Sequence, residues 1–367
     1  MFWKKKTAEE KSIEKSSKEV SQARFYLSKL ISIRLVRIVI ISIGLLIIIP
    51  IPFFILSIPK VQKNINYGVT FSNKYATEIG LDWHDAFIKS LDDLKVRNMR
   101  LVAYWDDIER TQDVYDYTDI KWQLDEARKR NVNVILAVGR KVPRYPECFE
   151  PTWWKDTRDE NIRDLELLEY VKRSVQELKQ FKNIEIWQVE NEPYWPFGEC
   201  KFPIKTETLK KEINVVRSID NRPILIQDSG EGGYWLATYR LGDKLGISMY
   251  RKIWYDFWGT FFKKFIYFQY PLAYWTYKIK ADIVGVPYQN IYVTELQGEP
   301  WGPALSTKLS NEEKDKTMSR TDFIDTLNYA QKAGFKNLYF WGVEWWLWEK
   351  EQNNNPYFWD TAKALMN

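Results

Sequence analysis

The chain has 367 residues, and 28% of them are charged, with a formal net charge of +5. Its single histidine and two cysteines exclude a histidine-rich zinc site and a four-cysteine metal cluster, and it has no GxGxxG or P-loop motif, so we expect no metal ion and no cofactor. The positive charge is concentrated in residues 1–63, which hold 12 Lys/Arg against 4 Glu. The rest of the chain has a net charge of −3, which argues against a nucleic-acid partner.

The first 65 residues divide into three segments. Residues 1–37 form a basic, polar arm, and Ile38–Ile58 then runs for 21 positions without a charge. As a helix this run is about 31 Å long, which matches the hydrocarbon core of a bilayer. A cleaved signal peptide is the alternative, but the leader is too long and no A-x-A-like site follows it. We therefore predict a transmembrane signal anchor at the cell membrane and a linker at 59–65, with the basic arm in the cytoplasm and residues 66–367 outside.

Residues 66–367 alternate regularly between strand and helix patterns. Eight short β-branched runs predict the strands Asn66–Thr70, Asn98–Val102, Asn133–Val138, Ile184–Val189, Ile224–Gln227, Leu245–Met249, Ile291–Glu295 and Asn337–Trp341. Between them, apolar stripes predict the helices Asp82–Lys95, Asp119–Arg130, Asp159–Lys179, Thr206–Ser218 and Asn311–Lys332. Eight alternating units are typical of an α/β fold of the (β/α)8 TIM-barrel type.

Two of the predicted strands run directly into a glutamate. The fourth ends in the sequence IEIWQVENEPY, which carries Asn191 and Glu192, and the seventh in IYVTELQG, which carries Glu295. The carboxyl ends of parallel strands are where chemistry is done in such a barrel. Glycoside hydrolysis needs such a pair, because one carboxyl group protonates the leaving oxygen and the other attacks the anomeric carbon.

The Asn191-Glu192-Pro193 sequence and the later strand-end Glu295 resemble the signature of the clan A glycoside hydrolases, which include cellulase-like and β-galactosidase-like families. The resemblance covers about residue 66 to the C-terminus and implies a (β/α)8 barrel with retaining chemistry. It implies Glu192 as the acid/base, Glu295 as the nucleophile and Asn191 as a ligand of the sugar hydroxyl next to the reacting carbon. In retaining enzymes the two carboxyl groups lie about 5 Å apart.

The resemblance also implies further substrate-binding residues. Arg100 in the second strand matches an arginine beside the nucleophile, and Tyr250 after the sixth matches a tyrosine that hydrogen-bonds it. Cellulase-like members usually carry histidine two residues before that tyrosine, where this chain has Ser248, so the family within the clan stays open.

Three more residues are candidate sugar contacts. Trp341, in the eighth strand, resembles the aromatic platform under the reacting sugar, and Glu344 follows it closely. Trp105 follows the second strand, where it is either a sugar contact or part of a helix start.

The two cysteines follow adjacent predicted strands. Cys148 lies after the third and Cys200 after the fourth, so their loops lie side by side at one end of a barrel. An extracytoplasmic location permits oxidation, and we therefore predict a disulfide, with two unrelated buried thiols as the alternative.

Residues 251–280 form an enlarged segment after the sixth strand, and 13 of these 30 residues are aromatic. Basic residues are interleaved with the rings, which suggests either a surface at the bilayer interface or a wall of the cleft with ordinary helix packing.

The favoured function is a membrane-anchored retaining glycosidase or transglycosidase that acts on an oligo- or polysaccharide. A catalytically silent barrel that binds a glycan in the cell envelope is the alternative, and retention of both glutamates with Asn191 and Arg100 favours catalysis. A barrel with unrelated chemistry also stays open, since a fold does not fix a function.

Overall fold

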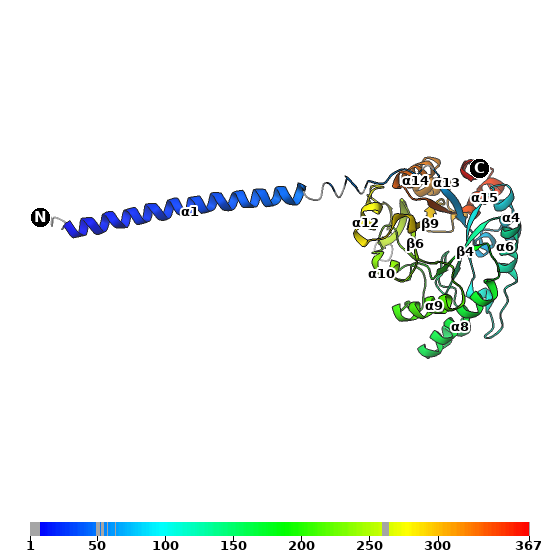
Figure 1. Ribbon diagram of the computed structural model, residues 1–367. Coiled ribbons are helices and arrows are strands. Elements are labelled where there is room, and N and C mark those ends of the chain that lie inside the picture. Colours follow the sequence, from blue (N-terminus) through cyan, green and yellow to red (C-terminus); the bar gives the residue numbers. More distant parts are fainter. Residues whose placement is uncertain are drawn as a thin grey trace. The chain divides into compact units, whose positions relative to one another are not determined.

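The computed structural model describes residues 8–366 except 49–51, 53, 54, 57, 63 and 259–263. The chain forms two compact units, Met1–Ile58 and Pro59–Asn367. The boundary falls at the end of the predicted membrane segment, and each unit is described by itself below (Figure 1).

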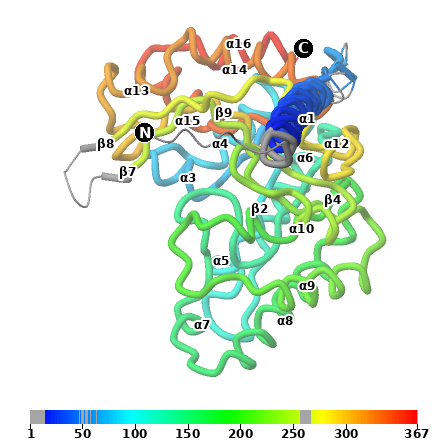
Figure 2. Tube along the Cα trace, turned by 90° about the vertical axis from the view of Figure 1, so that its left-hand side faces the viewer, coloured from blue at the N-terminus to red at the C-terminus, as the bar shows by residue number. Residues whose placement is uncertain are grey.

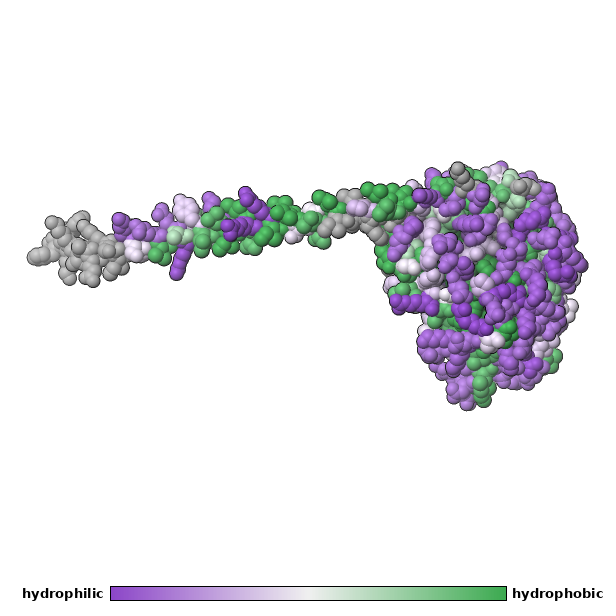
Figure 3. Space-filling model, in the orientation of Figure 1, coloured by the Kyte–Doolittle hydropathy of each residue, from purple (hydrophilic) through white to green (hydrophobic). Residues whose placement is uncertain are grey.

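The N-terminal unit is dominated by one helix, α1 (Ala8–Ile48). Its 41 residues give a length of about 60 Å. Apolar side chains from Phe25 to Ile48 are exposed along it, as the green atoms in Figure 3 show. The predicted span Ile38–Ile58 begins in α1, but six of its residues lie outside the described part of the chain. Within the described part, no helix combines the length and the apolar character that a bilayer crossing requires.

The second unit contains a closed barrel of eight parallel strands, as predicted. The strands pair in the circular order β1-β10-β9-β6-β5-β4-β3-β2. Their bounds are β1 (Asn66–Thr70), β2 (Asn98–Val102), β3 (Asn133–Val138), β4 (Ile184–Val189), β5 (Ile224–Asp228), β6 (Lys244–Met249), β9 (Ile291–Gln297) and β10 (Asn337–Trp341). Each predicted strand is therefore present, to within two residues at its ends.

Helices surround the barrel (Figures 1 and 2). They are α3 (Asn73–Glu78), α4 (Trp83–Asp92), α5 (Trp105–Ile108), α6 (Thr118–Lys129), α7 (Thr152–Asp156), α8 (Glu160–Leu178), α9 (Thr206–Ile219), α10 (Leu236–Tyr239), α12 (Thr276–Val284), α13 (Asn311–Met318), α14 (Arg320–Ala333), α15 (Val343–Gln352) and α16 (Tyr357–Met366). In Figure 2, α8 and α9 lie side by side on one flank, where they pack together.

The barrel has two apolar layers. Inside it, the side chains of Ile135, Ile186, Leu225 and Tyr339 form a small buried cluster. A much larger cluster fills the space between the outer faces of the strands and the helices. The inner cluster packs the barrel as a solid core, and the polar residues described below come after it on the same strands.

Two predicted elements differ from the structure. The helix expected over Asn311–Lys332 is two helices, α13 and α14, because Ser319 stops one and caps the next. The Ser319 hydroxyl accepts from the Asp322 backbone N–H, and the Asp322 carboxylate accepts from the Ser319 backbone N–H. This reciprocal capping box satisfies backbone N–H groups at the start of α14, which would be bonded within the helix if it were continuous.

The enlarged segment at 251–280 contains an antiparallel hairpin of β7 (Lys252–Trp258) and β8 (Lys264–Gln269), followed by α12. Tyr255, Ile266 and Phe268 are exposed on it. The hairpin and α12 occupy the place where a minimal barrel would have one helix, and the tip of the hairpin lies outside the described residues.

Candidate active site

Glu192 and Glu295 both lie at the carboxyl end of the barrel. Glu295 is inside β9, and Glu192 follows β4 by three residues. Both side chains are buried, with exposed fractions of 5% for Glu295 and 6% for Glu192. Ser248 connects them, because it pairs with Glu295 across the β6–β9 ladder and its hydroxyl donates to Oε1 of Glu192 at 2.8 Å. The two predicted strand ends therefore meet in one site.

Three donors surround the Glu295 carboxylate. Arg100 Nη1 lies 3.1 Å and Gln227 Nε2 2.6 Å from its Oε1, and the Tyr250 hydroxyl donates to Oε2 at 3.3 Å. These charge-assisted and neutral hydrogen bonds hold both carboxylate oxygens in place. A charged carboxylate is the form that acts as a nucleophile.

Arg100 connects this carboxylate to β4. Its side chain is fully buried, and it donates to Gln188 Oε1 at 2.8 Å and to Asn191 Oδ1 at 2.6 Å. Burial lowers the pKa of Arg100, and the negative charge of Glu295 opposes that shift. Because arginine keeps its charge in proteins, Arg100 is a fixed cation between Asn191 and Glu295.

Glu192 has the opposite electrostatic environment. Burial raises its pKa well above the ordinary value of 4.5, and the nearby carboxyl groups of Glu295 and Glu147 raise it further. Its backbone has a φ of +43°, a conformation that residues other than glycine seldom adopt. Lys141 supports this strained backbone, because its ammonium group donates to the Glu192 carbonyl at 2.8 Å. Glu192 is therefore held in place in an environment that favours its protonated form.

Trp341 lies at the end of β10, as expected for a platform, but another residue covers one face of its ring. The guanidinium of Arg144 lies 4.3 Å from the Trp341 ring centroid and 3.8 Å from that of Tyr75. Arg144 also forms ion pairs with Glu299 and, at 2.6 Å, with Glu344. The Glu344 carboxylate additionally accepts from the Ser72 backbone N–H at 2.6 Å. Glu344 thus holds Arg144 over the indole.

Trp105 does not line a cleft. It has no exposed surface, it stacks on Tyr170 at 4.9 Å, and its indole N–H donates to Glu109 at 2.7 Å. It is the first residue of α5, so of the two alternatives above the helix start applies. The expectation of a sugar contact fails here because the ring is needed in the outer core.

Glu109 belongs to a group of three carboxylates, with Asp113 and Glu166, whose oxygens lie within 4.8 Å of one another. The Glu109 oxygens already accept from Trp105 and from the Asp113 backbone N–H. Such a group satisfies its own hydrogen bonds, so it contributes nothing to the site around Glu192.

Several residues of the site were missed in the sequence. Gln188 and Gln227 lie two positions after Ile186 and Leu225 of the inner cluster, so the period of two places their side chains inside the barrel. A polar residue at an inward position of a barrel strand is a signal that could have identified both. Lys141 and Glu147 lie in the loop after β3, where no periodic pattern exists to identify them.

The loops after β3 and β4 are joined covalently. Cys148 and Cys200 form the predicted disulfide, with Cα atoms 5.1 Å apart. Backbone hydrogen bonds run alongside it, from the Asn191 N–H to the Lys141 carbonyl and from the Glu199 N–H to the Pro146 carbonyl. The two loops therefore form one structural unit beside Glu192.

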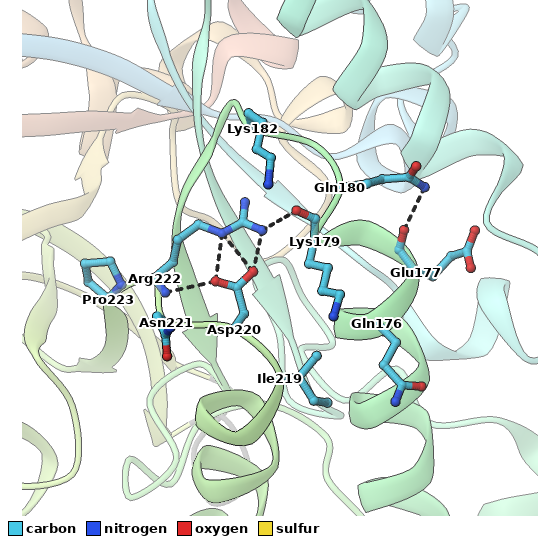
Figure 4. Close-up of a pocket in the computed structure, with 10 residues that line it drawn as sticks. All are labelled: Gln176, Glu177, Lys179, Gln180, Lys182, Ile219, Asp220, Asn221, Arg222 and Pro223. Atoms are coloured by element: carbon cyan, nitrogen blue, oxygen red, sulfur yellow. Dashed lines mark hydrogen bonds and ion pairs between the residues drawn. The ribbon is translucent and has the colours of Figure 1, made fainter.

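A separate open pocket of about 900 Å³ lies at the amino ends of the strands (Figure 4). Residues from the end of α8 and from the turn between α9 and β5 line it. Its arginine, Arg222, is bound to Asp220 and to the carbonyls of Lys179, Phe181 and Ile184. Arg222 and Asp220 pair with each other there, and neither glutamate of the candidate site lines this pocket.

No protein-family model and no curated protein sequence matches the chain. Among solved structures, an exo-β-1,4-mannosidase from Opitutaceae bacterium strain TAV5 is similar, with a TM-score of 0.54 and 14% identity over 84% of this chain. This chain spans only 61% of the mannosidase.

A xylanase 10B from Thermotoga maritima has a TM-score of 0.52 and 17% identity, and the match covers 83% of this chain and 94% of the xylanase. The GH5_18 protein of Streptomyces cattleya has a TM-score of 0.51 and 14% identity, over 76% of this chain and 70% of its own. At such low identity the likeness is one of fold. The chain shares the (β/α)8 barrel fold with these three proteins.

Proposed function

We propose that the protein is a retaining glycoside hydrolase in which Glu192 is the acid/base and Glu295 the nucleophile. The observation that carries the proposal is the contrast between the two carboxyl groups in one buried site. Arg100 pairs with Glu295 at 3.1 Å, whereas burial and two neighbouring carboxyl groups raise the pKa of Glu192. One carboxyl group beside a cation and another beside like charges suit the nucleophile and the acid that glycoside hydrolysis requires.

The reaction then has two steps. In the first, the Glu295 carboxylate attacks the anomeric carbon while Glu192 transfers its proton to the departing glycosidic oxygen, which leaves a glycosyl ester on Glu295. In the second, the Glu192 carboxylate takes a proton from a water molecule, which attacks the same carbon and releases Glu295. Transfer to a sugar hydroxyl in place of water gives the transglycosidase variant.

We assign Asn191 and Tyr250 to binding the reacting sugar. The Tyr250 hydroxyl donates to Glu295 directly, and Asn191 accepts from Arg100, which pairs with Glu295. The substrate class is an oligo- or polysaccharide. The neighbours named as a mannosidase and a xylanase support including mannosides and xylosides among the first substrates tested.

The test is hydrolysis of aryl glycosides and cell-envelope polysaccharides by the full chain, with proton NMR of the first-formed product. A product that keeps the anomeric configuration of the substrate supports the retaining mechanism. An inverted product contradicts the role of Glu295 as nucleophile. Glycan binding without any turnover instead favours the silent glycan-binding barrel.

We further propose that Ile38–Ile58 anchors the protein in the cell membrane with the barrel outside the cytoplasm. This rests on the sequence alone, in which 21 uncharged residues follow a basic arm. Protease added to intact cells should remove the barrel and spare residues 1–37. Protection of the barrel, with loss of the arm, would show the inverted orientation.

A further inference from the structure

A third carboxyl group, Glu147, lies beside the proposed catalytic pair. It is 4% exposed and sits in the loop after β3, at a backbone φ of +67°. The charges of Glu295 and Glu147 both raise the pKa of Glu192, and Glu295 also raises that of Glu147. Three carboxyl groups from three different loops or strands therefore share one small buried volume.

Glu147 contacts both residues of the Asn191-Glu192 sequence. Its Oε1 accepts from the Asn191 side-chain amide at 3.2 Å, while the other end of that amide accepts from Arg100. Its Oε2 lies 3.4 Å from the Lys141 ammonium group, which donates to the Glu192 backbone carbonyl. Glu147 thus binds the nitrogen end of the Asn191 amide, whose oxygen accepts from Arg100 and Gln188, and it pairs with the lysine that holds the strained backbone of Glu192.

The chain holds Glu147 itself firmly. The next residue, Cys148, is in the disulfide to Cys200, and the Glu147 backbone N–H donates to the Arg144 carbonyl at 2.6 Å. Its carbonyl accepts from the Val142 N–H at 2.8 Å. A positive φ and a buried carboxyl group are both unfavourable, so a loop that keeps them must be stabilised by these surrounding contacts.

We propose that Glu147 is a positioning residue of the active site, whose carboxyl group orients the Asn191 amide and, through Lys141, the backbone of Glu192. The kinetic part of its test rests on the proposed glycosidase function, but the structural part does not.

The charged groups around Glu147 predict a specific pH effect. Burial raises the pKa of Glu147 to about 8, Glu295 adds to this shift, and Lys141 and Arg100 oppose it. Glu147 therefore becomes negative near pH 8, and its charge then favours the protonated form of Glu192. Loss of that negative charge lowers the pKa of Glu192, so the basic limb of the pH–rate profile moves to lower pH.

The experiment uses the full chain with Glu147→Gln, Glu147→Ala and the control Glu150→Gln. Glu150 is in the same loop and equally buried, but it pairs with Arg140 at 2.7 Å. The glutamine variant keeps an acceptor for Asn191, so we expect it to retain most of kcat/KM while the basic limb moves down by about one pH unit. The alanine variant loses the acceptor too, and we expect kcat/KM to fall about 100-fold, as small misplacements of catalytic groups do.

Crystal structures of the same variants provide the readout that needs no activity. In Glu147→Ala the Asn191 amide nitrogen loses its acceptor, so this side chain should shift, and Lys141 should move away from the Glu192 carbonyl. The acceptor for Asn191 should persist in Glu147→Gln, and both contacts should persist in Glu150→Gln. Unchanged contacts in the alanine variant would refute positioning, whatever the kinetics. An unmoved basic limb in Glu147→Gln, or equal losses in Glu147→Ala and Glu150→Gln, would also refute it. If the wild type hydrolyses no glycoside, the glycosidase proposal fails and the crystal structures still decide the role of Glu147.

Discussion

Glu192 and Asp220 lie at opposite ends of the barrel and have opposite electrostatic environments. At the carboxyl end, Glu147, Glu192 and Glu231 all have raised pKa values, with burial as the largest cause. At the amino end, burial also acts on Asp220, but hydrogen bonds from Arg222 outweigh it and lower the pKa of that carboxyl group. The amino end has the open pocket, yet the groups whose protonation suits catalysis lie at the other end.

The difference shows why the open pocket does not identify the candidate active site. Asp220 and Arg222 form a compensated pair whose side chains are 10% and 18% exposed, which is an arrangement that stabilises the turn before β5. At the carboxyl end, Arg100 pairs with Glu295, whereas the carboxyl group of Glu192 lies near those of Glu295 and Glu147. Burying a carboxyl group without a neighbouring cation costs stability, and proteins retain such groups at sites where a proton is transferred.

The strongest test of this comparison is to remove carboxyl groups at both ends of the barrel. Glu192→Gln and Glu295→Gln should each lower kcat/KM about 1,000-fold or more, because each removes a reacting group. Glu185→Gln changes an exposed glutamate in β4 near its amino end and should leave activity close to wild type. An active Glu295→Gln enzyme would contradict the assignment of the site.

A second comparison replaces one arginine at each end. Arg100→Met leaves Glu295 buried without its cation, and we expect the free energy of unfolding to fall by about 3–5 kcal/mol. Arg222→Met removes a partly exposed arginine, so we expect a loss of about 1–3 kcal/mol. Urea denaturation measures both. Equal losses would show that the two ends do not differ in how they compensate charge.

A third comparison concerns the disulfide, which joins loops at the carboxyl end only. Cys148 and Cys200 are separated by 52 positions, and replacing both by serine should cost about 2–4 kcal/mol in the chain-entropy model. The same loss should appear when the wild type is reduced, while the reducing agent should not affect the double variant. A double variant as stable as the oxidised wild type would show that backbone hydrogen bonds alone hold the loops together.

Much of this architecture follows from regular patterns in the sequence. The eight barrel strands are short β-branched runs bounded by turn residues, so their number and order were predictable. The disulfide followed from the order of the strands, because adjacent strands bring their loops together. The split between α13 and α14 was not predicted, since the run has no proline or glycine to interrupt it. The Ser319-x-x-Asp322 capping box is the signal that marks the break.

The rest of the site depends on tertiary contacts that no local pattern encodes. Glu147, Lys141 and Arg144 belong to a loop of irregular backbone, and their partners lie far away in the sequence. Trp105 stayed open between a sugar contact and a helix start for a related reason, because a tryptophan after a strand end is equally suited to a cleft wall and to the core. Only the packing of α5 against Tyr170 decides between them.

The smallest expected effect is on the pH dependence of stability, to which Glu231 and Asp220 should contribute with opposite signs. Glu231 accepts from the Tyr277 hydroxyl at 2.7 Å and from the Tyr250 backbone N–H at 2.9 Å, but burial still raises its pKa to about 7. Its ordinary value is 4.5, so the folded protein holds this proton more tightly than the unfolded chain does. The stabilisation that this bound proton provides is complete below pH 4.5 and is lost as the pH rises towards 7.

Asp220 should act the other way, because its pKa is lower in the folded protein. Its contribution is complete above the ordinary value of 3.8 and is lost as the pH falls through the folded value. Tm measured from pH 3 to 8 should therefore decline less between pH 4.5 and 7 in Glu231→Gln than in the wild type. In Asp220→Asn the Tm should instead decline less below pH 3.8, from a lower value at neutral pH. If both variants change the same limb of the Tm profile, the two ends of the barrel do not differ in the way that their buried acids indicate.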